Sequence, residues 1–143
     1  MPQVEMRFEN MDEVQAAMRR YGDQAQAAIA RAVRATGVQI RSDIQRRIQR
    51  GPHTGEVYER GSIAHQASAP GESPATDTGF LVSSIEFKMT GPATAQIESR
   101  LGYAYHLEFG TVHIAPRPAW TPSIEAQTPE FNRRIREAIA GLV

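Results

Sequence analysis

The chain opens with alternating apolar and polar residues and then changes to a helical period. The segment QVEMRFE, residues 3–9, places an apolar side chain at every second position, which predicts a half-buried strand. From Met11 to about Arg50, apolar residues recur at steps of three and four, as on one face of a helix. Gly51-Pro52 ends this pattern, because proline cannot continue a helical hydrogen-bond ladder.

The long helical segment does not carry one continuous apolar stripe. Its early apolar positions drift backwards around the helix, whereas the later isoleucines, spaced by four, drift forwards. Gly22 and Gly37 are weak points, and we expect a bend or break near Gly22. An unbroken helix of this length would measure about 60 Å, against a diameter of roughly 37 Å for a compact domain of this size. We therefore expect another copy of the chain to cover the overhang.

The composition of residues 51–79 predicts a long irregular segment, called the arm below. Its last part, SAPGESPATDTG, combines prolines, glycines and short polar residues, and cannot form a core or a central strand. Loops of this length are uncommon in compact domains and are usually functional or disordered. Asp77 or Thr78 could cap a short helix that runs through residues 80–84.

Two further segments have the alternation of a β-hairpin. Residues 85–89 alternate, Gly91-Pro92 predicts a turn, and residues 95–99 return as the partner strand. Residues 101–111, LGYAYHLEFGT, predict a short helical or extended piece with core-facing aromatic side chains.

Prolines shape the prediction for the remainder of the chain. Pro116, Pro118 and Pro122 predict an extended crossing that contains Trp120. Thr128-Pro129 predicts the start of a last helix with an apolar face. The predicted fold is therefore α+β: an N-terminal strand, a long helix, an extended loop, an antiparallel hairpin and a C-terminal helix. We find no repeat and no linker, so residues 1–143 are expected to form one domain.

The amino-acid composition excludes some classes of function but does not identify one. A hydrophobic content of 41% is typical of a globular protein. The formal net charge is zero, so long-range electrostatic attraction to nucleic acid or to an anionic membrane is not expected. The chain has no cysteine, which excludes disulfides and thiolate chemistry. It shows no signal peptide and no apolar run of about 18 residues, so we expect no membrane contact and synthesis in a cytoplasm. Of 16 basic residues, all but Lys88 are arginine, which suits protein interfaces but also follows from a GC-rich genome.

Candidate catalytic and metal-binding residues are few. His106, Glu108 and His113 are the best candidates for a metal site, but their spacing matches no helical zinc motif. The serines lack the glycine-flanked setting of a nucleophile, and no glycine-rich turn could hold phosphate. We therefore expect neither an enzyme nor a bound metal or cofactor.

An arginine-rich stretch in the long helix allows a different function. Residues 31–50 contain six arginines against Asp43 alone, a local charge of +5, and such a helix could neutralise DNA phosphates without reading sequence. The arginines are spread around the helix outside the isoleucine stripe, which favours a solvated or subunit-facing surface. An arginine-helix DNA-binding dimer is the alternative prediction.

Two sequence blocks resemble a known family. The first is HQASAPGESPATDTGFLVSSI, residues 65–85, and the second is YAYHLEFGT, residues 103–111, followed by RPAW, residues 117–120. In this order, after a long helix, they resemble neck or tail-completion proteins of long-tailed bacteriophages, similar to the tail-completion component of phage Hong Kong 97. The resemblance spans most of residues 11–125. In place of a bulky aromatic after Arg-Pro, this chain has Ala119 and only then Trp120.

The resemblance implies a structural virion protein of the neck, located at the joint between capsid portal and tail tube. Relatives of this kind assemble as rings, often sixfold, around the channel through which genome DNA passes without sequence recognition. The implied partners are further copies of the chain and either portal and head-closure or tail-terminator and tail-tube proteins. The number of copies, the side contacted, the element that lines the channel and the state before assembly remain open.

The same resemblance marks the residues expected in motifs or subunit contacts. In the arm, Pro70 and Pro74 would hold the strip extended along a neighbouring subunit, and glycines would turn the backbone where side chains clash. Glu108 and Arg117 are expected to pair, within a subunit or across the ring. Tyr103, Tyr105, Phe109 and Trp120 are expected mainly in the core. The full set of candidates is Pro70, Gly71, Pro74, Asp77, Thr78, Gly79, Leu81, Tyr103, Glu108, Phe109, Gly110, Arg117 and Pro118.

Overall fold

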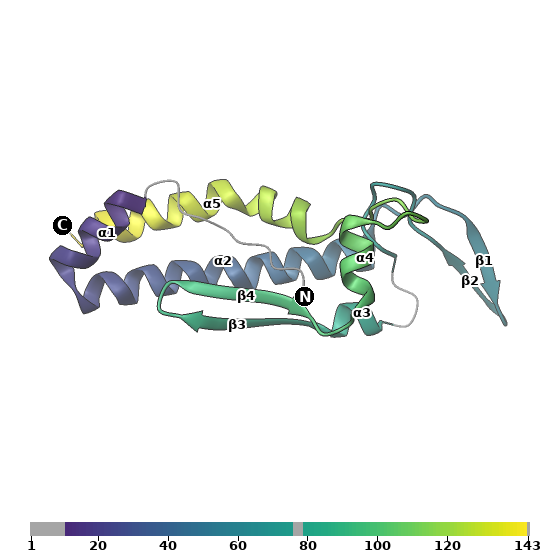
Figure 1. Ribbon diagram of the computed structural model, residues 1–143, viewed down its shortest axis with the longest axis horizontal. Helices are drawn as coiled ribbons and strands as arrows, with labels where there is room; N and C mark the ends of the chain where they lie inside the picture. The colour runs from purple at the N-terminus through teal and green to yellow at the C-terminus, as the bar shows by residue number, and fades with distance from the viewer. Residues whose placement is uncertain (1–10, 76–78, 143) are drawn as a thin grey trace.

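A single long helix, α2 (Asp23–Arg50), runs along the molecule and organises the other elements. In the computed structural model, which describes residues 11–75 and 79–142, α5 (Trp120–Ala140) lies antiparallel to α2 on one side. The hairpin of β3 (Ile85–Gly91) and β4 (Thr94–Ser99) covers the opposite side of α2 (Figure 1). The expected N-terminal strand, residues 3–9, lies outside the described residues.

The expected α+β class is confirmed. Four shorter elements complete the described chain: α1 (Met11–Tyr21), α3 (Phe80–Ser83), α4 (Tyr103–Phe109) and a second hairpin formed by β1 (Val57–Arg60) and β2 (Ile63–Gln66). The strands make two separate antiparallel sheets of two strands each. The predicted short helix at residues 80–84 and the predicted hairpin at 85–99 are both present.

The predicted break of the long helix near Gly22 is confirmed. Gly22 has φ +55, a conformation that favours glycine, and α1 folds back from this point toward α2 and α5. The remaining helix is about 42 Å long. Its buried residues extend from Ala25 to Ile48, so the chain covers α2 along its own length. The expected overhang, and with it the need for a second copy to cover this helix, is not found.

The interior contains two apolar clusters, one toward each end of α2. One joins Ile40, Ile44 and Ile48 of α2 to Trp120 and to α3, β3 and α4; the other joins Ile29 and Val33 to α1 and α5. Polar contacts tie α2 to α5 between and beside these clusters: Arg134 donates to Thr36 Oγ1 over 3.0 Å, and Gln127 donates to the buried Asp43 over 2.6 Å.

The last helix begins earlier than its prolines predict. α5 starts at Trp120, not at Thr128, so Pro122 lies in its first turn and Pro129 lies inside it. Proline is tolerated in a first turn because those backbone N–H groups have no acceptor within the helix. The extended crossing therefore ends at Ala119. A carboxylate from a distant part of the chain fixes this start, as described below, and no local pattern could reveal it.

Gly37 is not a weak point of α2, because the helix is continuous through it. The residue is buried, and a Cβ built there would lie 2.3 Å from Cε2 of Phe87 on β3. Glycine thus lets the β3–β4 hairpin approach the helix closely.

This contact predicts a sign change in a double-mutant cycle. Gly37→Ala should lower the free energy of unfolding by about 1–3 kcal/mol, because the added methyl overlaps the Phe87 ring. In a Phe87→Ala background the same change should be neutral or stabilising by up to about 1 kcal/mol, because alanine favours a helix over glycine. Urea unfolding of the four proteins measures the coupling. Equal losses in both backgrounds would rule out the close approach.

Candidate assembly interface

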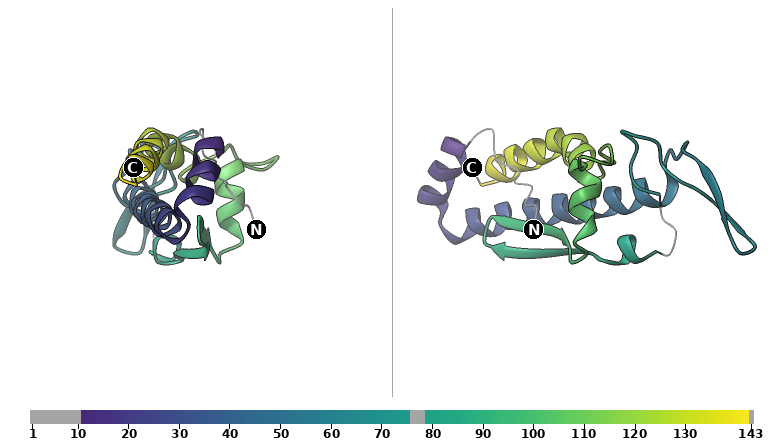
Figure 2. Two further views of the ribbon diagram at one scale, coloured as in Figure 1. Left: turned by 90° about the vertical axis from the view of Figure 1, so that its left-hand side faces the viewer. Right: turned by 45° about the vertical axis from the view of Figure 1, so that its right-hand side comes forward.

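Four segments meet at the end of the molecule where α2 finishes at Arg50. They are the described part of the arm (residues 51–75), α3, α4 and the loop between α4 and α5 (residues 110–119), as Figures 1 and 2 show. Most of the candidate residues from the family motifs lie in these segments. Asp77 and Thr78 lie outside the described residues, and the N-cap of α3 is Gly79.

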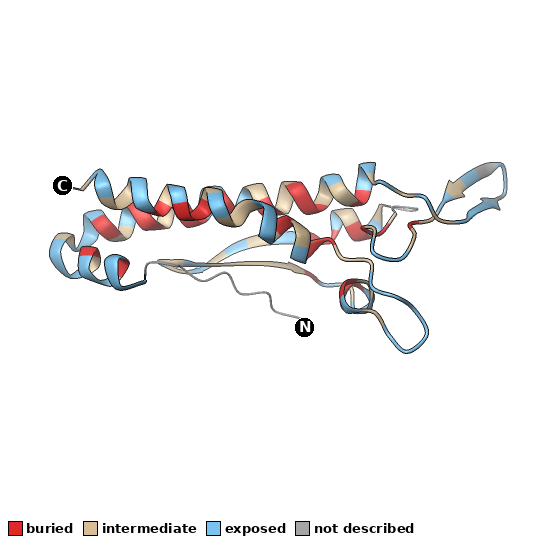
Figure 3. Ribbon diagram, turned by 90° about the horizontal axis from the view of Figure 1, so that it is seen from above, coloured by how far each residue is buried: buried red, intermediate tan, exposed pale blue. Residues whose placement is uncertain are grey.

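The arm is not irregular throughout. Its first half forms the β1–β2 hairpin, with Val57 opposite Gln66 and Arg60 opposite Ile63 around a two-residue turn at Gly61-Ser62. Gly61 has φ +65, as such tight hairpin turns require. The hairpin projects beyond the other elements (Figures 1 and 3), and Val57 and Tyr58 are 62% and 44% exposed. Four-residue strands with polar neighbours produce too weak an alternation to be recognised from sequence.

The second half of the arm, residues 67–75, is held by its own chain. The Gly71 amide donates to the Pro116 carbonyl over 2.9 Å, and Ser73 Oγ donates to the Pro118 carbonyl over 2.9 Å. The Arg117 guanidinium donates to the carbonyl and hydroxyl oxygens of Ser68. The strip thus packs against residues 116–118 of its own chain, and its expected contact with a neighbouring subunit stays a prediction.

Glu72 ties the two ends of the arm together. Its carboxylate accepts hydrogen bonds from the amides of Thr54 and Ala69, each over 2.8 Å, and from the Thr54 hydroxyl. The amide of Ala69, followed by the hydroxyl and amide of Thr54, lowers the pKa of Glu72 below its ordinary value of 4.5. The base of the projecting hairpin is therefore closed by one carboxylate.

Glycine is required in these segments for two different reasons. A Cβ at Gly110 would lie 2.9 Å from the Ile114 carbonyl, in a backbone that also has φ +74. Gly71 and Gly79 have φ +85 and +78, but a Cβ at either would meet nothing within 4 Å. Their predicted role in turning the backbone is supported, although the reason is conformational strain and not a clash.

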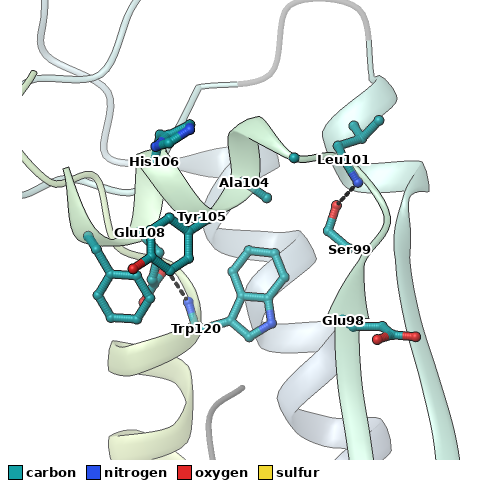
Figure 4. A pocket seen from close by; sticks show the side chains of 10 residues that line it. Glu98, Ser99, Leu101, Ala104, Tyr105, His106, Glu108 and Trp120 are labelled. Carbon is teal, nitrogen blue, oxygen red and sulfur yellow. Dashed lines mark hydrogen bonds between the residues drawn. The ribbon is translucent and has the colours of Figure 1, made fainter. Parts of the chain in front are cut away.

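Glu108 joins α4 to the start of α5. This side chain is only 6% exposed, and its carboxylate accepts hydrogen bonds from the amides of Ala119, Trp120 and Thr121 over 2.7, 3.0 and 2.7 Å. These are amides at the beginning of α5, which has no cap from its own N-cap residue, Ala119. Figure 4 shows the bond from the Trp120 backbone to Glu108. The expected pairing of Glu108 with Arg117 is not formed within the chain, because each has other partners.

Because Ala104 and Glu108 face inward, the aromatic residues of α4 face solvent. Tyr103, Tyr105 and Phe109 are 47%, 45% and 49% exposed, so the expectation that they are core residues is wrong. Trp120 is buried, as expected, and its indole N–H donates to the Ile97 carbonyl over 3.2 Å. Tyr105, Phe109 and Trp120 line a cavity of about 310 Å³ on one side of α4 (Figure 4).

A second cavity, of about 390 Å³, lies on the arm side of α4. Tyr58 of β1, Phe80 of α3 and Tyr103 of α4 form its exposed walls, and Leu81 and Leu107 contribute apolar surface. Phe80 is 67% exposed. Tyr58 and Phe80 were not among the singled-out residues, because neither belongs to a periodic apolar pattern.

The surface of α4 and of the loop after it carries little charge. Between Leu101 and Pro116 the one carboxylate or guanidinium side chain is that of Glu108, which is buried against α5. Arg117, which follows, is engaged with Ser68. The surface of α4 and the loop is therefore aromatic, apolar and almost free of exposed charge.

The same geometry bears on the metal candidates. His106 is exposed on α4, whereas Glu108 is buried and both of its carboxylate oxygens accept hydrogen bonds from the start of α5. Within residues 11–75 and 79–142, no group of three or more His, Asp or Glu side chains could hold a metal ion. None of the helices in these ranges is long and apolar enough to cross a membrane.

Comparison with known families shows which family the chain belongs to. Residues 12–110 match the family described as "Bacteriophage HK97-gp10, putative tail-component". The chain belongs to this family. The match confirms the resemblance seen in the sequence blocks and ends at Gly110, so residues 117–120 lie beyond it. No curated protein and no solved structure matches the chain. The protein is therefore a bacteriophage tail component by family.

The Glu72 contacts predict that the base of the arm opens in acid. Because the pKa of Glu72 is lowered in the folded state, its bonds stabilise the arm fully above the ordinary pKa of 4.5. This stabilisation is lost as the pH falls through the lowered folded value. Hydrogen-exchange protection of the Thr54 and Ala69 amides should decline in that range. In Glu72→Gln the protection should already be low at neutral pH, with Glu59→Gln as the exposed control. Protection that does not change with pH would contradict this role.

Proposed function

We propose that the chain is a structural protein of the phage neck. In this role it joins or completes the tail at the connector between head and tail, as one subunit of a homo-oligomeric, sixfold ring around the DNA channel. The proposal starts from the family, which consists of bacteriophage tail components. Its place is then the virion, after synthesis in the cytoplasm of the bacterial host. The role requires no catalytic group and no cofactor.

The observation that carries the proposal is the aromatic, nearly uncharged surface of α4 and of the loop after it. Tyr103, Tyr105 and Phe109 of α4 expose almost half of their surface, and Tyr103 shares a cavity with the exposed Phe80 of α3. Protein interfaces are enriched in aromatic residues and depleted of charge at their centres. Exposed apolar patches on soluble proteins mark such contact sites. This surface therefore has the composition of a protein–protein interface and not that of a DNA-binding surface.

The projecting β1–β2 hairpin supports the same interpretation. An isolated hairpin of two strands is only marginally stable in water, and it gains stability by packing on another surface. Val57 and Tyr58 are exposed on this hairpin. Its position beyond the end of α2 suits contact with an adjoining subunit (Figure 1). Portal and head-closure proteins, or tail-terminator and tail-tube proteins, are the neighbours that a neck location would provide.

The arginines of α2 give less support to the DNA-binding alternative. Arg41 donates to the Ile85 carbonyl over 3.0 Å, and Arg46 pairs with Asp43 over 2.9 Å, so both act within the fold. Arg31, Arg34 and Arg50 are exposed and are spaced along the helix. DNA that passes through a ring requires no recognition beyond this weak, sequence-independent attraction.

Two measurements separate the neck ring from the DNA-binding dimer. Light scattering of the purified chain should show particles of several copies, and Tyr105→Ser should lower their yield because it removes an exposed aromatic side chain from α4. Val38→Ser, at an exposed position of α2, is the matched control and should leave the yield unchanged.

The second measurement is the salt dependence of binding to duplex DNA. A ring subunit should bind weakly, with a shallow slope, because the exposed arginines of α2 are spaced along the helix and few of them could contact phosphates together. A particle of two copies with a steep salt slope would contradict the proposal and support the arginine-helix dimer.

A further inference from the structure

The loop after α4 holds one apolar side chain almost completely in solvent. Val112 is 95% exposed, and Ile114 in the same loop is 41% exposed. Figure 2 shows the loop projecting sideways from the body of the molecule beyond α4. A scattered exposed valine needs no explanation. This one differs because the loop around it is built to hold its shape.

Hydrogen bonds fix the backbone on both sides of Val112. The Thr111 amide donates to the Ile114 carbonyl over 2.9 Å. The Thr111 hydroxyl accepts from the amides of His113 and Ile114 over 3.1 and 3.2 Å. Further back, the Arg117 amide donates to the Leu107 carbonyl over 2.6 Å and closes the base of the loop. A side chain presented on such a preorganised turn loses little conformational entropy when it binds.

The arm-side cavity has the chemistry that such a side chain requires. Its exposed walls are the rings of Tyr58, Phe80 and Tyr103, and its volume of about 390 Å³ is in the range of sites that enclose a small group. Arg117, which also lines it, already donates to Ser68. The cavity beside Trp120 is less suitable, because Glu98 and Glu108 are in its lining.

We propose that Val112, with Ile114 beside it, inserts into the Tyr58–Phe80–Tyr103 cavity of an adjoining copy of the chain. Both surfaces are apolar and their contact costs little desolvation, because neither presents an exposed carboxylate or an unengaged guanidinium that would have to lose its hydration. They are different surfaces of one chain, so the contact is heterologous, and repetition of a heterologous contact generates a ring when the rotation closes. This inference rests on the proposed ring and specifies its subunit contact.

Cysteine cross-linking tests the contact directly, since the chain has no cysteine of its own. Two single-cysteine proteins, Val112→Cys and Phe80→Cys, are tagged to differ in size, mixed at high concentration and oxidised. A disulfide requires the two Cβ atoms to approach about 3.8 Å. The mixture should give the mixed dimer at least about tenfold more efficiently than Val112→Cys mixed with Val38→Cys, because a docked pair has a high effective concentration. Val38 is an exposed apolar residue of α2 and serves as the matched control.

A second variant removes the apolar contact without threatening the fold. Val112→Asp places a charge in the cavity of the neighbour and should weaken self-association by about tenfold or more. Val38→Asp should not change it.

Several results would overturn the contact. The first is that Val112→Cys cross-links equally well to Phe80→Cys and to Val38→Cys. The second is that Val112→Asp and Val38→Asp self-associate equally strongly. The third is that the unmodified chain stays monomeric at about 1 mM. Particles of several copies without the cross-link would reject this contact and leave the neck ring standing. A two-copy particle with a steep DNA salt slope would reject the ring itself.

Discussion

The arrangement of α4, its loop and the start of α5 depends on one buried carboxylate. Glu108 of α4 accepts three backbone N–H groups at the start of α5, where the chain supplies no cap of its own. These amides would otherwise be unsatisfied next to the apolar cluster around Trp120, at a cost of about 1–3 kcal/mol for each buried group. The negative charge also lies at the positive end of the helix dipole. Glu108 therefore fixes the direction of α5 along α2 and, at the same time, the rotation of α4.

That rotation decides which side chains face solvent. With Ala104 and Glu108 turned inward, Tyr103, Tyr105 and Phe109 point outward, and the loop that leaves α4 is closed by Arg117 on Leu107. The rest of the molecule needs no help from a partner to cover itself, because α5 and the β3–β4 hairpin bury both sides of α2. Within the described residues, α2 is thus covered along its length, and most of the exposed large apolar side chains lie on the arm, α3, α4 and the loop after α4. This distribution is what the proposed ring subunit requires, because its contact surface is separate from the core that stabilises the chain.

Local sequence patterns were sufficient to predict the elements that are determined by neighbouring residues in the chain. Alternation predicted the hairpin at 85–99, and glycine predicted the break at Gly22. Prediction failed where the cause was distant in the sequence. Pro122 and Pro129 suggested a late start for α5. The helix begins earlier because Glu108 caps it from eleven residues before Ala119, and such a cap cannot be recognised from the local sequence. The aromatic residues of α4 were assigned to the core because hydrophobicity alone cannot show that a glutamate has taken the buried face. The family motifs include Phe109 and Gly110, whose role in assembly stays a prediction. Val112 and Phe80 lie outside any periodic pattern, so their exposure required the structure.

The central claim is that the Glu108 carboxylate holds α4 and its loop in the shape used for assembly. Hydrogen exchange at the Ala119, Trp120 and Thr121 amides of Glu108→Ala, measured beside self-association by light scattering, tests it most directly. Glu125→Ala, at an exposed position of α5, is the control. The account predicts that exchange at the three amides accelerates by about tenfold or more in Glu108→Ala, and that association is lost with it. Wild-type exchange at these amides, or full association despite faster exchange, would contradict the account.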